Sequence, residues 1–116
     1  MMKLVTPDGV VIANYATEAQ STAERIGGWM FREKPCDDEA LLIPGCALVH
    51  TCFMRFRLDI VFLDDDDRVL SIRSRIAPWR VSGCKGACSV LELAEGRAEA
   101  SGISVGQRLV LTESIS

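Results

Sequence analysis

The chain has 116 residues, with 16 acidic and 13 basic side chains and a formal net charge of −3. This length predicts a single domain over residues 1–116, and the 48% of apolar residues suffices for one core. Charges of both signs are interspersed without a basic stripe, so nucleic acid is not an expected partner. No apolar run approaches the roughly 20 residues of a membrane span. The N-terminus lacks an apolar signal segment, so we expect no membrane association and a cytoplasmic location.

A hairpin and a helix are predicted in the first part of the chain. The turn sequence Pro7-Asp8-Gly9 between apolar residues predicts a β-hairpin over residues 3–15. Thr17 with Gln20 three residues later matches a helix capping box. Apolar residues then recur at helical spacing until Gly27-Gly28, where the predicted helix ends or bends.

Short strands are predicted for the rest of the chain, with turn residues between them. They are expected at residues 41–43, 47–51, 58–63, 69–76, 89–93 and 108–112, with one helical turn at 98–101. Many short strands joined by turns predict a mainly β fold. We expect a single-domain antiparallel β-sandwich, or a partly closed barrel, with one N-terminal helix.

Two carboxylates stand inside apolar strands. Asp59 lies in the run 58–63, and Glu92 lies between Leu91 and Leu93. A buried carboxylate without a partner is costly, so each is expected to have a cationic or hydrogen-bonding partner or to line a polar pocket. A pocket would make Asp59 an acceptor or a general base. The alternative is a structural ion pair with one of several arginines: Arg25, Arg32, Arg55 or Arg80.

His50 is the only histidine. It is a candidate general base or metal ligand, or a histidine that forms a hydrogen bond at the edge of the core. Cys46 and His50 would be about 13 Å apart on one strand, too far to share a zinc ion. His50 and Cys52 could both reach a metal, joined by Cys84 and Cys88 across the fold, but this spacing is a weak zinc signal. We expect no metal and no other cofactor. The five cysteines are an odd number, which predicts reduced thiols without a disulfide.

Three sequence blocks carry a resemblance to a known family. They are residues 25–32, residues 49–64 followed by Pro78-Trp79-Arg80, and residues 90–96. Over residues 16–111 this pattern resembles the domain-of-unknown-function family 192, a prokaryotic family of small, mainly β proteins. The resemblance implies a compact, sandwich-like fold and implies no activity. Arg57 departs from it where the family usually has proline, and Trp29 where leucine is usual.

The expected function is that of a non-enzymatic binding module for a small polar or anionic ligand or a protein segment. We expect the end of the predicted helix to pack beside residues 50–59, bringing its arginines next to His50 and Asp59. Two alternatives stay open: a hydrolase-like enzyme that uses Asp59, Glu92 and His50, and a structural protein whose paired charges only fix the fold. The candidate ligand-binding residues are Arg25, Arg32, His50, Met54, Asp59, Trp79 and Arg80.

Overall fold

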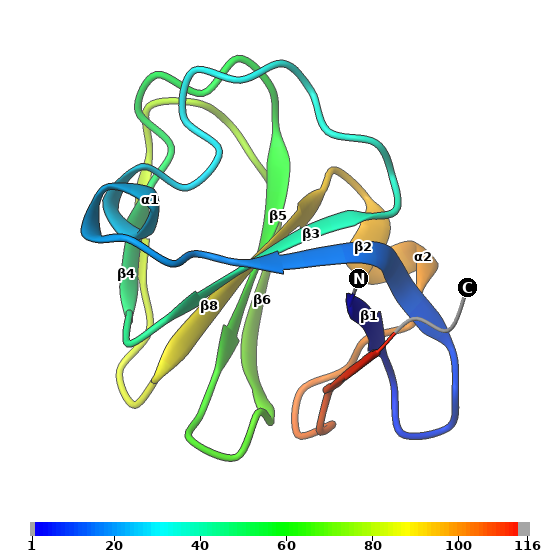
Figure 1. The fold of residues 1–116 in the computed structure, drawn as a ribbon. Coiled ribbons are helices and arrows are strands. Elements are labelled where there is room, and N and C mark those ends of the chain that lie inside the picture. The colour runs from blue at the N-terminus through cyan, green and yellow to red at the C-terminus, as the bar shows by residue number, and fades with distance from the viewer. Residues whose placement is uncertain (1, 114–116) are drawn as a thin grey trace.

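Seven strands of the computed structural model form one large sheet, and two further strands form a small one (Figure 1). The structure describes residues 2–113. The small sheet pairs β4 (Leu48–His50) with β7 (Val81–Gly83), and the helices α1 (Thr22–Gly27) and α2 (Arg97–Ala100) are short. The strand order of the large sheet is β6 (Val69–Ile76), β5 (Leu58–Leu63), β8 (Ser89–Ala94), β3 (Glu39–Pro44), β2 (Val11–Glu18), β1 (Met2–Val5) and β9 (Val110–Glu113).

The predicted mainly β fold is confirmed, but the large sheet is mixed and not purely antiparallel. β2 and β3 run parallel, from the pair Tyr15 and Glu39 to the pair Glu18 and Leu42. Parallel neighbours need a crossover connection, and residues 19–38, which include α1, provide it. None of the helices in residues 2–113 has the length and hydropathy needed to cross a membrane.

The large sheet curls without closing. Its outermost strands approach each other where Arg68 and Arg108 form an isolated bridge. There the amide of Val69 donates to the carbonyl oxygen of Gln107 at 2.9 Å. A bridge is not a ladder, so the sheet formed by the described residues is not a closed barrel.

The helix α1 begins later than the sequence predicted. Ser21 is its N-cap, because the side chain of Ser21 accepts a hydrogen bond from the amide of Glu24 at 3.1 Å. The carboxylate of Glu24 in turn accepts from the amide of Gln20 at 2.8 Å. This is a variant of the capping box one turn beyond the predicted one, because the return bond comes from the amide of the residue before the N-cap. Thr17 instead belongs to β2.

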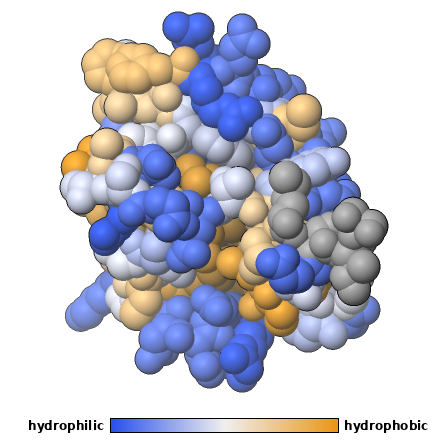
Figure 2. Space-filling model, in the orientation of Figure 1, coloured by the Kyte–Doolittle hydropathy of each residue, from blue (hydrophilic) through white to orange (hydrophobic). Residues whose placement is uncertain are grey.

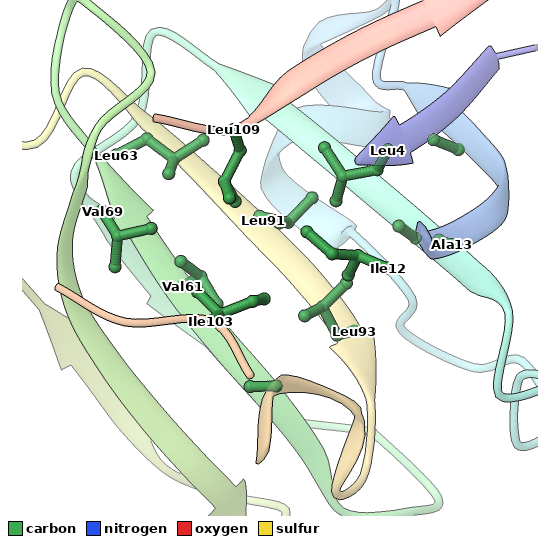
Figure 3. Close-up of a cluster of buried hydrophobic side chains, with 13 residues drawn as sticks. Leu4, Ile12, Ala13, Val61, Leu63, Val69, Leu91, Leu93, Ile103 and Leu109 are labelled. Atoms are coloured by element: carbon green, nitrogen blue, oxygen red, sulfur yellow. The ribbon is translucent and has the colours of Figure 1, made fainter. Parts of the chain in front are cut away.

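The central strands separate two clusters of buried apolar side chains. Every residue of β5 and β8 is buried, so both faces of these strands need a cover. On one face, Val61, Leu91 and Leu93 pack with residues of β1, β2 and the segment 98–109, as Figure 3 shows. On the other face, Ile60 and Phe62 pack with residues of the loops that follow α1 and β4.

Asp59 is fully buried on the first of these faces, where its carboxylate binds three backbone amides. Oδ1 accepts from the amides of Arg75 at 2.9 Å and Gly96 at 3.2 Å, and Oδ2 accepts from the amide of Ala98 at 2.9 Å. Arg75 lies in a bulge of β6 at a φ of 53°, and Gly96 is the N-cap of α2, which has no side-chain cap of its own. Asp59 thus caps α2 from a different element and fixes the bulge. The predicted burial and hydrogen bonding of Asp59 are confirmed. Among the described residues no arginine side chain binds it, so the alternative of an ion pair does not hold.

Replacing Asp59 with alanine should therefore lower the free energy of unfolding by about 3 kcal/mol or more, because three amides lose their charged acceptor. Urea unfolding at neutral pH measures the difference. Asp65→Ala in the exposed turn after β5 is the matched control and should change stability by less than about 0.5 kcal/mol. Equal stability of the Asp59 and Asp65 variants would contradict this structural role.

Candidate functional site

Asp59 and Glu92 do not converge. In the antiparallel pair of β5 and β8, Asp59 lies opposite Leu93 and Ile60 lies opposite Glu92. Residues directly opposite each other share a face, and successive residues alternate. The two carboxylates therefore project from opposite faces of the sheet. The acid–base pair considered from the sequence does not form.

Glu92 is buried in the second apolar cluster, between its cross-strand neighbours Leu41 and Ile60. Its Oε2 accepts one hydrogen bond, from the amide of Trp29 at 3.3 Å. Burial raises the pKa of Glu92 to about 7, although this hydrogen bond acts in the opposite direction. Gly28 passes directly over the carboxyl group with a φ of 54°, and a Cβ at this position would collide with Glu92 Oε1. The carboxyl group thus anchors the loop after α1.

The same loop packs beside the segment that follows β4, as the sequence predicted. The amide of Phe31 donates to the carbonyl oxygen of Phe53 at 3.2 Å. Below this contact, Trp29 packs against Phe56 with ring centroids 6.2 Å apart. Met54 lies in the same buried cluster, so its side chain is part of the core and not of a surface site.

Three aromatic side chains on these loops are exposed and touch one another. The ring centroids of Phe31 and Phe53 are 5.1 Å apart, and those of Phe53 and Trp79 are 4.7 Å apart in a T-shaped contact. Their relative exposures are 58%, 49% and 58%. Figure 2 shows apolar atoms gathered at the upper left of this face, at the end of the molecule where the loops lie in Figure 1.

All three aromatic residues adopt left-handed backbone conformations. Their φ values are 68° for Phe31, 63° for Phe53 and 65° for Trp79. Only two other non-glycine residues in the described part of the chain have positive φ, namely Asp67 and Arg75. Such conformations are unfavourable for bulky side chains, and they persist where the surrounding structure imposes them.

Two exposed arginines stand close to the exposed rings in the sequence. Arg55 is exposed and stands two residues after Phe53, while the alternate residues Met54 and Phe56 are buried. Arg57, directly before β5, lies by strand alternation on the face of Asp59 and not on the side of the loops. Arg80 follows Trp79, and the only partner of its guanidinium among the described residues is the carbonyl oxygen of Trp79. We call Phe31, Phe53, Trp79, Arg55 and Arg80 the aromatic–arginine surface.

The other predicted arginines are already engaged. Arg25 donates to the carbonyl oxygen of Gly45 at 3.3 Å. Arg32 forms a salt bridge with Glu39 at 3.0 Å and lies over the Trp29 ring, 5.4 Å from its centroid. Neither binds Asp59, whose carboxylate accepts from backbone amides.

His50 lies on β4, directly opposite Val81 of β7. Its ring is half-buried, and Nδ1 is buried without a hydrogen-bond partner among the described residues. β4 covers the second cluster through Val49, whereas Asp59 lies on the face of the first cluster. His50 and Asp59 therefore do not share a site. No group of three His, Cys, Asp or Glu side chains within residues 2–113 is arranged to hold a metal ion.

Trp79 and Arg80 were identified from the sequence, whereas Phe31 and Phe53 were missed. Both phenylalanines stand in the family-like blocks, and each has an arginine one or two residues later. An arginine close to an aromatic residue could have marked these exposed positions. The same blocks, however, also hold Trp29 and Phe56, which are buried although arginines follow them closely. Sequence alone does not separate these two groups.

The fold and sequence place this chain among small, mainly β proteins of one uncharacterised family. The sequence profile of the domain-of-unknown-function family 192, described as "Uncharacterized ACR", matches residues 4–111. The chain belongs to this family. No curated protein is similar enough to count as a relative.

Two crystal structures are similar over most of this chain. A protein of unknown function from Novosphingobium aromaticivorans is 26% identical with a TM-score of 0.78, covering 94% of this chain and 82% of its own. A protein from Sinorhizobium meliloti, described as a candidate transcription regulator, is 23% identical with a TM-score of 0.80. That match covers 94% of this chain and 90% of the other, and it shows a shared fold.

The raised pKa of Glu92 predicts a specific pH dependence of stability. The folded chain keeps the proton up to about pH 7, whereas an unfolded chain releases it near the ordinary value of 4.5. The contribution of Glu92 to stability is therefore fully present below about pH 4.5 and falls by about 3 kcal/mol as the pH rises to about 7. Glu92→Gln should lack this decrease in urea unfolding between pH 5 and 8.

The exposed Glu33→Gln is the control for this measurement and should follow the wild-type pH dependence. If Glu92→Gln and wild type keep parallel stability curves over this range, Glu92 is ionised in the folded chain and the prediction is wrong.

Proposed function

We propose that the chain is a non-enzymatic binding module whose partner docks on the aromatic–arginine surface. The observation that carries the proposal is the contact of three exposed aromatic rings, each held by a left-handed backbone. Exposed aromatic groups that touch one another offer apolar area without first having to be ordered, which lowers the entropic cost of binding. Tryptophan and arginine are also the residue types that contribute most to binding energy at protein interfaces.

The charges favour an anionic partner. Arg55 and Arg80 have no acidic partner among the described residues, so their guanidinium groups are available. Guanidinium groups bind carboxylates and phosphates through paired hydrogen bonds and stack on aromatic faces. A partner with both anionic and apolar or planar groups would use both parts of the surface.

The separation of the titratable groups supports binding over hydrolysis. A hydrolase-like mechanism with Asp59, Glu92 and His50 would need these side chains within reach of one substrate atom. Asp59 is saturated by three amides, and Glu92 projects from the other face of the sheet. The description of the Sinorhizobium meliloti neighbour as a candidate transcription regulator is compatible with a binding role.

Replacing Trp79 with asparagine should separate binding from stability. Asparagine tolerates the left-handed backbone, so relief of strain offsets the lost ring contact and the free energy of unfolding should change by no more than about 1 kcal/mol. Binding should be lost. The measurement follows backbone amide chemical shifts by NMR during titration with poly-L-glutamate, oligothymidylate and inorganic phosphate. In the wild type, at least one of these should shift the amides of Phe31, Phe53 and Trp79 in a saturable way.

The matched control is Tyr15→Asn, which removes an exposed aromatic side chain from β2, outside the surface. It should leave the titration unchanged. The proposal fails if none of the three anions perturbs the surface, or if Trp79→Asn binds as the wild type does.

A further inference from the structure

The aromatic–arginine surface continues into an exposed aliphatic face of the small sheet. Leu48 and Val81 are 62% and 68% exposed. Leu48 lies opposite Gly83, and Val81 lies opposite His50 and two residues after Trp79. Val49 points the other way, into the buried cluster, so Leu48, His50 and Val81 share the outer face. Exposed aromatic and aliphatic groups thus adjoin each other along the segments 48–53 and 79–83.

The chain is charge-segregated around this face. None of its 16 acidic residues lies in residues 40–58 or 68–91, the segments that form β4, β7 and most of the surface. Residues 40–58 hold Arg55 and Arg57, and the stretch 79–85 holds Arg80 and Lys85. The net charge of the whole chain is nevertheless −3, so these segments carry positive charge in a chain that is acidic overall.

We infer that the occupant of this surface is a segment of another protein that combines acidic with apolar side chains. This inference rests on the proposed function and names its partner class. Carboxylates of the segment would pair with the guanidinium groups of Arg55 and Arg80. The apolar side chains of the segment would cover Trp79, Phe53, Leu48 and Val81. The exposed apolar residues would then lose water contact together, as at the core of a protein interface.

A nucleic-acid strand fits this surface less well. Bases stack on aromatic rings, but such sites also need a basic groove that follows the phosphates. The loop that carries Phe31 continues into acidic residues at Glu33, Asp37 and Asp38, so the positive area ends close to the rings. Leu48 and Val81 offer no planar face for a base. Arginine-lined aromatic and aliphatic area is better matched by carboxylates spaced among apolar side chains.

The test is selection of short random peptides displayed on phage against the immobilised full chain. Counter-selection against Trp79→Asn removes peptides that bind elsewhere. We expect the enriched sequences to combine Asp or Glu with apolar residues. Synthesised peptides should lose at least about tenfold in affinity for both Trp79→Asn and Arg80→Ser, and should keep their affinity for Tyr15→Asn. Replacing Asp by Asn and Glu by Gln in these peptides should lower their affinity to a similar degree.

Oligothymidylate is measured in parallel under the same salt conditions. The inference is wrong if the oligonucleotide binds in a Trp79-dependent way and no peptide does. The proposed binding surface would still hold in that case. Enriched peptides that lack acidic residues would overturn the inference as well. If neither peptides nor oligonucleotide depend on Trp79, the inference and the proposed function fail together.

Discussion

The pairing of β5 with β8 is the constraint on which the rest of the structure depends. Both strands are buried along their whole length and pair over six residues. A strand pair that is apolar on both faces requires two covers. The first cover comes from β1, β2 and the chain around α2. The second is built from loops, which reach the sheet through Trp29, Met54 and Phe56. Loops anchored in this way present their remaining residues outward, and Phe31 and Phe53 are among those.

The two carboxylates in these strands are accommodated in different ways. Asp59 receives three amide hydrogen bonds, so its charge is compensated and it organises α2 and the bulge of β6. Glu92 receives one, and burial keeps it protonated up to about pH 7. It is also in contact with Gly28, at the start of the loop that carries Phe31. Each carboxylate therefore holds a cover in place on its own face of the sheet, and this explains why charged residues occur in strands that are otherwise apolar.

Local patterns in the sequence predicted the elements whose structure is decided locally. The run 58–63 is β-branched and aromatic, and the strand occupies those residues. β7 was missed because Val81–Gly83 is short and forms only by pairing with β4, about 30 residues earlier. Both Thr17 with Gln20 and Ser21 with Glu24 satisfy the capping pattern. The parallel pairing of β2 with β3 extends to Glu18, which commits Thr17 to a strand and leaves Ser21 as the cap.

The site was only partly predictable for a related reason. Trp79 and Arg80 stood out as a neighbouring aromatic and cation, but the exposure of an aromatic residue depends on which turns the loops take. Phe53 and Phe56 are the same residue type three positions apart, yet the first is 49% exposed and the second 8%. Likewise, burial alone predicts that Asp59 has a cationic or hydrogen-bonding partner, but not which groups supply it. The amides that bind it come from Arg75, Gly96 and Ala98, which only the folded topology brings together.

The energetics of the three exposed rings indicate what their arrangement contributes. Two ring contacts contribute about 0.5–1.5 kcal/mol each, while three left-handed bulky residues cost about 1 kcal/mol or more each. The net contribution of the ring contacts and the backbone strain to the stability of the fold is therefore close to zero, and half-exposed rings bury little apolar surface. What the arrangement does provide is a set of aromatic groups fixed in position before any partner arrives. Because ordering of side chains is one of the main costs of association, rings fixed in this way would lower that cost for the partner that we propose.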